Sequence, residues 1–168
     1  MSTATTGRLS LLRVDFADLY ARHLCRHSQV GINITHLAAL FGVWFGVYGF
    51  LYALTQQAWL PVALAAVYLG AIAVNAPLRV TIASAVFLAL FITVVLLLPE
   101  LPLWVYVLLV PIFYKVQSWS HKLWHIEQDM TEFNQRYPKG PELFVILLIY
   151  EVPIVLNYLL FGRRDWAA

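Results

Sequence analysis

The sequence predicts an all-α integral membrane protein with about five transmembrane helices, preceded by an amphipathic interfacial helix. Of its 168 residues, 61% are hydrophobic and only 12% are charged. Soluble domains average about 45–50% apolar and about 25% charged residues, and one of this size buries only about 70% of the surface that its unfolded chain exposes. Lipid is therefore expected to cover much of the apolar surface. The length suits a single integral membrane domain over residues 1–168.

Five apolar stretches approach the roughly 20 residues that a helix needs to cross the hydrocarbon of a bilayer. They are predicted as spans at residues 33–55, 58–74, 79–98, 103–125 and 142–161. The connections between the first four are short and contain Gln, Asn or Pro, which favour turns. A membrane barrel is not expected, because the alternating segments of about 10 residues that it requires are missing.

The distribution of Lys and Arg predicts which way the chain faces. These residues lie before the first span, in the second loop and around the fourth span, whereas the loops after the first and third spans have none. By the positive-inside rule the N-terminus is expected in the cytoplasm, with the chain in the inner membrane of a bacterial cell or the endoplasmic reticulum of a eukaryote. Arg163 and Arg164 break this pattern if the fifth span crosses fully, so that span is expected either to violate the rule or to be re-entrant.

Residues 11–29 are predicted to form the interfacial helix. Leu12, Phe16, Leu19 and Leu24 alternate there with charged and polar residues, which is typical of a helix lying in the membrane interface. The lipid bilayer is therefore an expected partner. Nucleic acid is not, since a net charge of only +2 gives no broad basic surface.

The five histidines are predicted to gather at the cytoplasmic face. His23 and His27 lie four apart on the interfacial segment, His36 lies one turn inside the first span, and His121 and His125 lie four apart at the end of the fourth. Because the first and fourth spans run in opposite directions, the start of one and the end of the other reach the same side of the membrane. All five imidazoles are therefore expected at similar depth.

This histidine pattern predicts a metal site. Residues four apart on a helix point the same way, which lets two imidazoles share one ion. The single cysteine, Cys25, excludes a thiolate cluster within one chain, so imidazole with carboxylate favours Fe(II), with Zn or Mn as alternatives. A zinc protease is not expected, because no glutamate stands between His121 and His125 as in H-E-x-x-H. Interfacial histidines without a metal are the structural alternative.

Carboxylates and amides are predicted around these histidines. If the fourth helix continues, Asp129 and Glu132 fall within roughly 80° of His121 and His125 at about 100° per residue. Both carboxylates are predicted as catalytic or ligating groups. Asn33 and Gln117 are expected to act as ligands or to accept hydrogen bonds that fix the imidazole tautomers.

Two ionisable residues are expected deep inside the membrane. Lys115 lies ten residues before His125, and Glu151 lies nine after Glu142, so both are roughly 14 Å deep at 1.5 Å per residue. Charges inside a membrane usually pair with each other or face a cavity. We expect an ion pair between Lys115 and Glu151 that joins the fourth and fifth spans.

Three short motifs resemble the family of membrane-bound 2-hydroxy-fatty-acid dioxygenases. One is the run Tyr20, His27, Asn33, His36, similar to the family's Y…H…N…H run at its first span. Others are Gln117-x-x-x-His121-Lys122, which resembles its Q-x-x-x-G-H-K turn, and Pro153 in the final span. Together they cover about a third of the chain. The family's Asn-Pro after the first histidine is Ser28-Gln29 here, and its Gly before the later histidine is Ser120.

The resemblance implies a ferrous iron held by His27, His36 and His121, with Tyr20 among the supporting residues. It also implies that dioxygen cleaves a 2-hydroxy acid to the acid one carbon shorter. The resemblance thus points to a membrane-embedded non-haem iron oxygenase acting on a lipid or fatty acyl substrate.

Three other functions stay open on the sequence alone. A bis-histidine haem protein in electron transfer would use His36 with His121 or His125. A scaffold or metal-transport subunit would keep the histidines without turnover. A cyclase without metal would use Asp129 and Glu151 as acids. The sequence leaves an oligomer possible.

Overall fold

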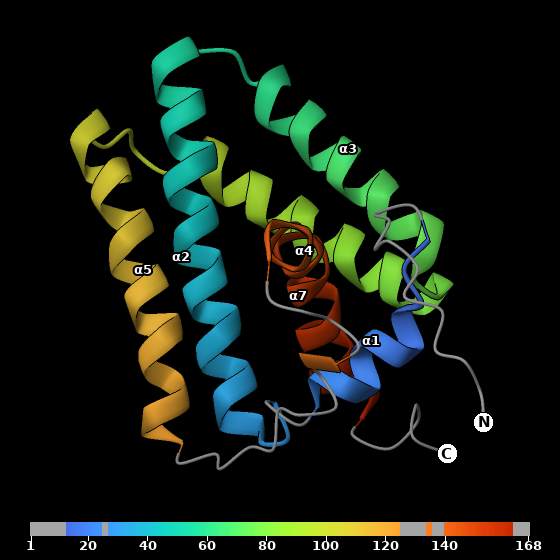
Figure 1. Cartoon of the computed structure of the whole chain (residues 1–168). Helices are drawn as coiled ribbons and strands as arrows, with labels where there is room; N and C mark the ends of the chain where they lie inside the picture. Colours follow the sequence, from blue (N-terminus) through green and yellow to red (C-terminus); the bar gives the residue numbers. More distant parts are fainter. Residues whose placement is uncertain (1–12, 25–26, 125–133, 136–139, 163–168) are drawn as a thin grey trace, which may run out of the picture.

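The computed structural model describes residues 13–24, 27–124, 134–135 and 140–162, and this part of the chain is all-helical. Its helices, drawn in Figure 1, are α1 (Phe16–His23), α2 (Val30–Thr55), α3 (Trp59–Asn75), α4 (Leu78–Leu97), α5 (Leu103–Leu123) and α7 (Pro141–Phe161). The bounds of the last five lie within three residues of the five predicted spans. Runs of apolar residues, ended by Gln, Asn and Pro, thus place the long helices correctly.

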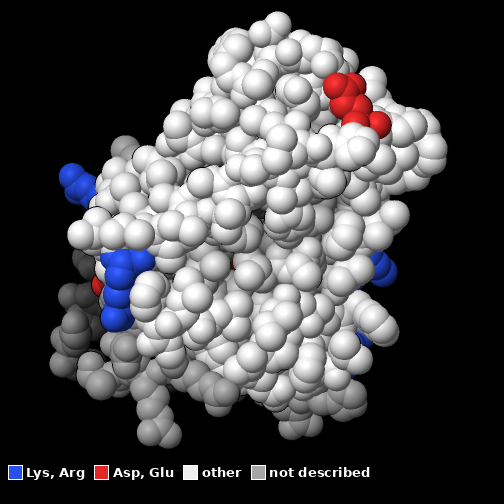
Figure 2. All heavy atoms as spheres, turned by 180° about the vertical axis from the view of Figure 1, so that it is seen from behind, with Lys and Arg blue, Asp and Glu red and all other residues white. Residues whose placement is uncertain are grey.

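Three of these helices, α2, α4 and α7, are long and apolar enough to cross a membrane. Helix α3 is apolar but has only 17 residues, and α5 has 21 residues but ends in a polar stretch. Seen from behind, the molecule has a largely uncharged surface, with a few basic side chains and one acidic group near the top (Figure 2). These features are those of a membrane protein, while the number of five spans stays a prediction.

Helices α2 and α5 lie side by side and run in opposite directions (Figure 1). Glycines on α2 allow this close approach. A Cβ atom at Gly46 would lie 2.8 Å from the carbonyl oxygen of Tyr106, and one at Gly42 would collide with the ring of Phe113. Inside a membrane, helices associate through such close packing because lipid chains are as apolar as the side chains. The glycines therefore fix α5 against α2, with the end of one beside the start of the other.

Helix α1 packs on protein rather than lying free in the interface. Within the described residues this helix covers only Phe16–His23, not the whole predicted range 11–29. Phe16, Leu19 and Tyr20 are buried, and their cluster includes Ile146 and Tyr150 of α7. The predicted amphipathic face exists, but α7 covers it. This contact holds the C-terminal end of α1 against the rest of the molecule.

Helix α7 contains a proline that removes one backbone hydrogen bond, and a side chain of α3 supplies another donor in its place. Pro153 has no N–H group, so it leaves the carbonyl of Ile149, four residues earlier, without its helical donor. The hydroxyl of Tyr68 donates to that carbonyl at 2.6 Å. The neighbouring Tyr150 hydroxyl donates to the carbonyl of Ala71 at 3.1 Å. Asn75 Nδ2, at the end of α3, also donates to the Tyr150 hydroxyl at 2.6 Å, so three hydrogen bonds join α3 to the middle of α7, beside Glu151.

Candidate metal centre

Three histidines from separate elements converge at one end of the helix bundle. His36 comes from the second turn of α2, His121 from the last turn of α5, and His27 from the connection between α1 and α2. One nitrogen atom of each lies within 4.8 Å of the others. The antiparallel packing of α2 and α5 brings His36 and His121 together, as the sequence predicted.

The three imidazole rings face one another at steep angles. The ring centroids of His27 and His36 are 4.4 Å apart, those of His27 and His121 5.4 Å, and those of His36 and His121 4.9 Å. The interplanar angles are between 75° and 90°. His27 and His36 are each 1% exposed, and His121 is half-buried. Rings in this arrangement can point several nitrogen lone pairs at a common centre.

A second group overlaps the first. His23, at the end of α1, stacks on His27 with ring centroids 4.2 Å apart. Ligand atoms of His23, His27 and Glu151 also lie within 4.8 Å of one another. Four of the five histidines and one carboxylate therefore form a continuous cluster. The fifth histidine, His125, and both predicted catalytic carboxylates, Asp129 and Glu132, lie outside the described residues.

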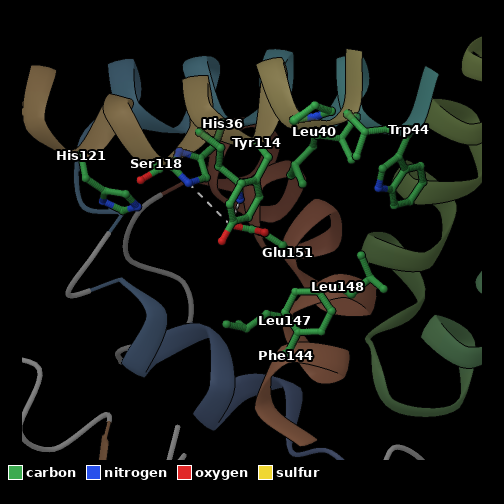
Figure 3. Close-up of a pocket in the computed structure, with 14 residues that line it drawn as sticks. His36, Leu40, Trp44, Tyr114, Ser118, His121, Phe144, Leu147, Leu148 and Glu151 are labelled. Carbon is green, nitrogen blue, oxygen red and sulfur yellow. Dashed lines mark hydrogen bonds and ion pairs between the residues drawn. The ribbon is translucent and has the colours of Figure 1, made fainter. Parts of the chain in front are cut away.

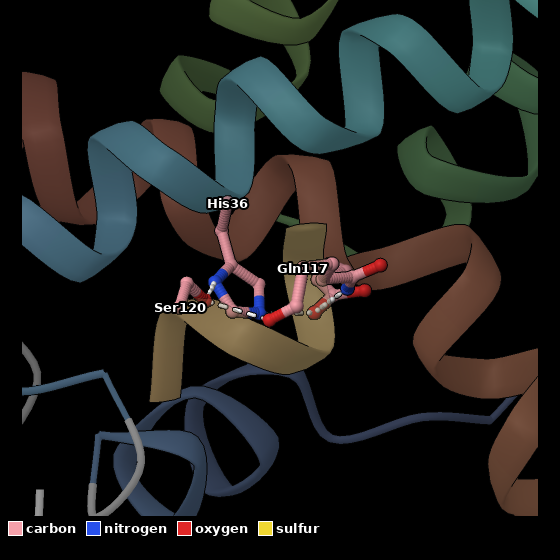
Figure 4. A network of polar contacts seen from close by, with 4 residues as sticks. His36, Gln117 and Ser120 are labelled. Atoms are coloured by element: carbon pink, nitrogen blue, oxygen red, sulfur yellow. Dashed lines mark hydrogen bonds and ion pairs between the residues drawn. The ribbon is translucent and has the colours of Figure 1, made fainter. Parts of the chain in front are cut away.

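A hydrogen-bond network orients His36 (Figure 4). The hydroxyl of Ser120 donates to the backbone carbonyl oxygen of Gln117 at 2.6 Å, and Ser120 Oγ lies 3.1 Å from His36 Nδ1. Because this hydroxyl uses its hydrogen on the carbonyl, its oxygen accepts the Nδ1 hydrogen of His36. In the neutral ring the lone pair of His36 is then on Nε2, which lies 3.6 Å from Glu151 Oε1. A metal-binding imidazole usually has its other nitrogen fixed in this way.

The carboxylate of Glu151 belongs to this network. Gln117 Nε2 donates to Glu151 Oε1 at 2.8 Å, so Gln117 supports the carboxylate instead of an imidazole. The predicted ion pair between Lys115 and Glu151 does not form among the described residues. Lys115 is exposed on the outer side of α5. The two residues share a depth, but the rotation of α5 turns Gln117, not Lys115, toward α7.

The other two residues predicted to support the histidines, Asn33 and Tyr20, donate hydrogen bonds to backbone carbonyl oxygens. Asn33 is fully buried, and its Nδ2 donates to the carbonyl oxygens of His27 at 2.7 Å and Gln29 at 2.8 Å. It therefore fixes the chain that carries His27. Tyr20 is packed between α1 and α7, and its hydroxyl donates to the carbonyl of Gly162 at 3.4 Å.

Sequence reasoning missed the roles of Ser120 and Glu151 at this site. Ser120 falls one residue before His121 and stood out only as a departure from a family motif. Its position three residues after Gln117 could have indicated a hydroxyl bonded back to its own helix. Glu151 was recognised as a costly charge, but its contacts with Gln117 and His36 were not predicted.

An apolar cleft of about 620 Å³ leads away from the cluster. His36, His121, Gln117 and Glu151 line its polar end, and Leu40 and Trp44 line the part along α2. Figure 3 shows His121 and Trp44 at opposite ends, with Glu151 between them and Leu148 opposite Leu40. Pockets of roughly 300–1,000 Å³ with a few convergent polar groups are typical ligand sites. The cleft therefore gives a small apolar molecule access to the histidines.

The described donor groups suit a hard or intermediate metal ion. They are four imidazoles and a carboxylate, which bind Fe(II), Zn or Mn and do not discriminate strongly between them. No family model, curated protein or solved structure matches this chain. What the protein does is therefore inferred from the geometry and chemistry of its own residues.

Proposed function

We propose that this chain is a membrane-embedded non-haem iron oxygenase that acts on a lipid or fatty acyl substrate. One observation carries the proposal: His36 and His121 line the polar end of a large apolar cleft, and a nitrogen atom of His27 lies within 4.8 Å of both. Converging imidazoles beside a ligand site, one of them oriented by Ser120, are expected to bind a metal ion. The resemblance of the same three histidines to those of membrane-bound 2-hydroxy-fatty-acid dioxygenases supports the same conclusion.

Each described residue has a part in this proposal. His27, His36 and His121 would hold Fe(II), two of them from the wall of the cleft. Glu151, fixed by Gln117, would be a fourth ligand or would accept a proton from the substrate. Bound ferrous iron would supply the activation of dioxygen, which apolar surroundings protect from water. The cleft would hold the apolar chain so that its polar head lies at the histidines.

The family resemblance narrows the reaction. It suggests a 2-hydroxy acid as substrate, dioxygen as four-electron oxidant and an acid one carbon shorter as product, with the original carboxyl carbon released as carbon dioxide and one water formed. A head group with a hydroxyl and a carboxylate suits the polar end, where imidazole nitrogens and the amide of Gln117 lie close together.

The haem alternative is less well supported by this geometry. Two histidines that ligate one haem must stand on opposite faces of a flat macrocycle. Here three rings meet from three directions, and their centroids are only 4.4 to 5.4 Å apart. A macrocycle between His36 and His121 would have to displace His27, which is 1% exposed.

Metal analysis tests the proposal. The protein would be purified anaerobically in detergent and its metal content measured by mass spectrometry, with a visible spectrum alongside. We expect near-stoichiometric iron without a Soret band in the wild type, and loss of iron in His36→Ala and His121→Ala. Glu151→Gln should weaken iron binding, whereas Glu100→Gln should not, because Glu100 lies at the far loop beside Gln56.

Turnover is the second part of the test. Wild-type protein loaded with iron should consume oxygen when given long-chain 2-hydroxy acids, and the histidine variants should not. Protein that binds no iron, zinc or manganese when each is offered would overturn the metal centre. A Soret band would favour the electron-transfer alternative instead.

A further inference from the structure

The cleft opens sideways between two helices that barely meet. Helices α5 and α7 both pack on α2, but they have little contact with each other in the part of the chain that the structure describes. The hydrogen bond from Gln117 to Glu151 bridges them at the polar end. Beyond it, the side chains at the opening are apolar or aromatic and exposed: Tyr114 and Phe144 are each 62% exposed and Leu148 is 48% exposed. This opening faces the hydrocarbon if these helices span the membrane.

The polarity of the cleft changes along its length. Its histidine end carries imidazole, amide and carboxylate groups, whereas Leu40, Val43 and Trp44 form its wall further along α2. Trp44 follows His36 by eight residues on the same helix, which is about 12 Å at 1.5 Å per residue. An amphiphile with one polar head and one long apolar tail matches this distribution.

Trp44 closes the far end of the cleft. Its side chain is only 7% exposed, because aromatic rings surround it. The ring of Tyr68 meets it edge-on with centroids 4.7 Å apart, and Tyr48 and Phe91 are each 6.0 Å away. Aromatic pairs at these distances attract one another. The indole is therefore a fixed wall and not a side chain that moves aside for a longer ligand.

We propose that the cleft binds a single acyl chain that enters sideways from the bilayer between α5 and α7, and that Trp44 stops its tail. Trp44 would then set the chain length that the protein accepts. Placing the polar head at the histidines rests on the proposed function, but the path of the tail rests on the cleft alone.

Photolabelling can test this path. The protein in lipid nanodiscs would be incubated with straight-chain fatty acids of increasing length that carry a diazirine near the methyl end. Illumination would attach the tail to the residues beside it, and mass spectrometry would identify the labelled peptides. We expect labels on α2 near Trp44 and on α7 near Leu148, with no label on Phe91 of α4.

Two substitutions on α2 form a matched pair for this experiment. Val43→Phe fills the cleft before Trp44 and should reduce labelling there about tenfold or more, the effect of a clash of about 1.4 kcal/mol. Val47→Phe is the same change one turn further along the helix, at a side chain that is 45% exposed and outside the cleft. It should leave the labelling unchanged. Trp44→Leu should let the longer probes label Phe91.

The outcomes separate this inference from the proposed function. Labels spread evenly over the exposed apolar helices, or equal labelling of both valine variants, would overturn the chain-binding cleft whether or not iron binds. A protein that binds no metal but shows the expected labels would overturn the oxygenase and leave the cleft standing. The same labelling pattern in His121→Ala would show that the tail site does not depend on the metal.

Discussion

The close packing of α2 on α5 can be tested by adding one methyl group. In Gly46→Ala, the new Cβ would lie 2.8 Å from the backbone oxygen of Tyr106 and 2.9 Å from Val110 Cγ2. Backbone cannot rotate away as a side chain can, so the two helices must separate. Gly70→Ala is the matched control, because a Cβ at Gly70 of α3 would meet nothing within 4 Å.

The expected size follows from two opposing effects. Overpacking a well-packed contact costs about 1–3 kcal/mol, whereas replacing Gly by Ala inside a helix gains about 0.5–1 kcal/mol. We therefore expect Gly46→Ala to lower the free energy of unfolding by about 0–2.5 kcal/mol relative to the wild type, and by about 1–3 kcal/mol relative to Gly70→Ala. Gly70→Ala has only the gain and should be as stable as the wild type or slightly more stable.

Unfolding by SDS in mixed micelles, followed by circular dichroism, measures both variants under the same conditions. Iron affinity is a second readout, since α2 carries His36 and α5 carries His121, and it should fall only in Gly46→Ala. If Gly46→Ala is as stable as Gly70→Ala and binds iron equally well, α2 and α5 do not approach each other as closely as described.

Three further predictions concern other parts of the molecule. Ser120→Ala removes the group that orients one imidazole and should weaken iron binding about 10–100-fold in a competition titration; unchanged affinity would contradict that role. Tyr68→Phe removes the donor to the Ile149 carbonyl and should lower stability in SDS by about 1–3 kcal/mol, and a smaller change would mean that the carbonyl finds another donor. In a Cys25→Ser background, Gln57→Cys should react with an impermeant maleimide added from the non-cytoplasmic side, and labelling only after the membrane is opened would reverse the predicted orientation.

The positions of the long helices could be predicted from the sequence because runs of about 20 apolar residues and short turns rich in Gln, Asn and Pro define them. The meeting of His36 with His121 could also be predicted, since it depends only on the direction of two helices and the depth of each residue. Both properties depend on where a residue lies along the chain, and the order of residues states that directly.

The rotation of each helix about its own axis could not be predicted in the same way. Helix α7 is apolar on nearly all sides, so its pattern does not say which residue faces a neighbour. Lys115 and Glu151 therefore looked like partners, although Gln117 occupies the position beside Glu151. For α1 the pattern showed an apolar face, but both lipid and α7 could cover such a face.

The hydrogen bond between Tyr68 and Ile149 bears on how the protein is made. Helix α3 is synthesised before α7, and α7 carries a carbonyl that its own Pro153 leaves without a donor. In hydrocarbon such a group costs several kcal/mol until it is paired. During biogenesis α7 would then be poorly accepted by lipid on its own and would settle once α3 is beside it. A chain that lacks α3 should accordingly be retained by the insertion machinery or degraded, even though the histidines lie on other helices.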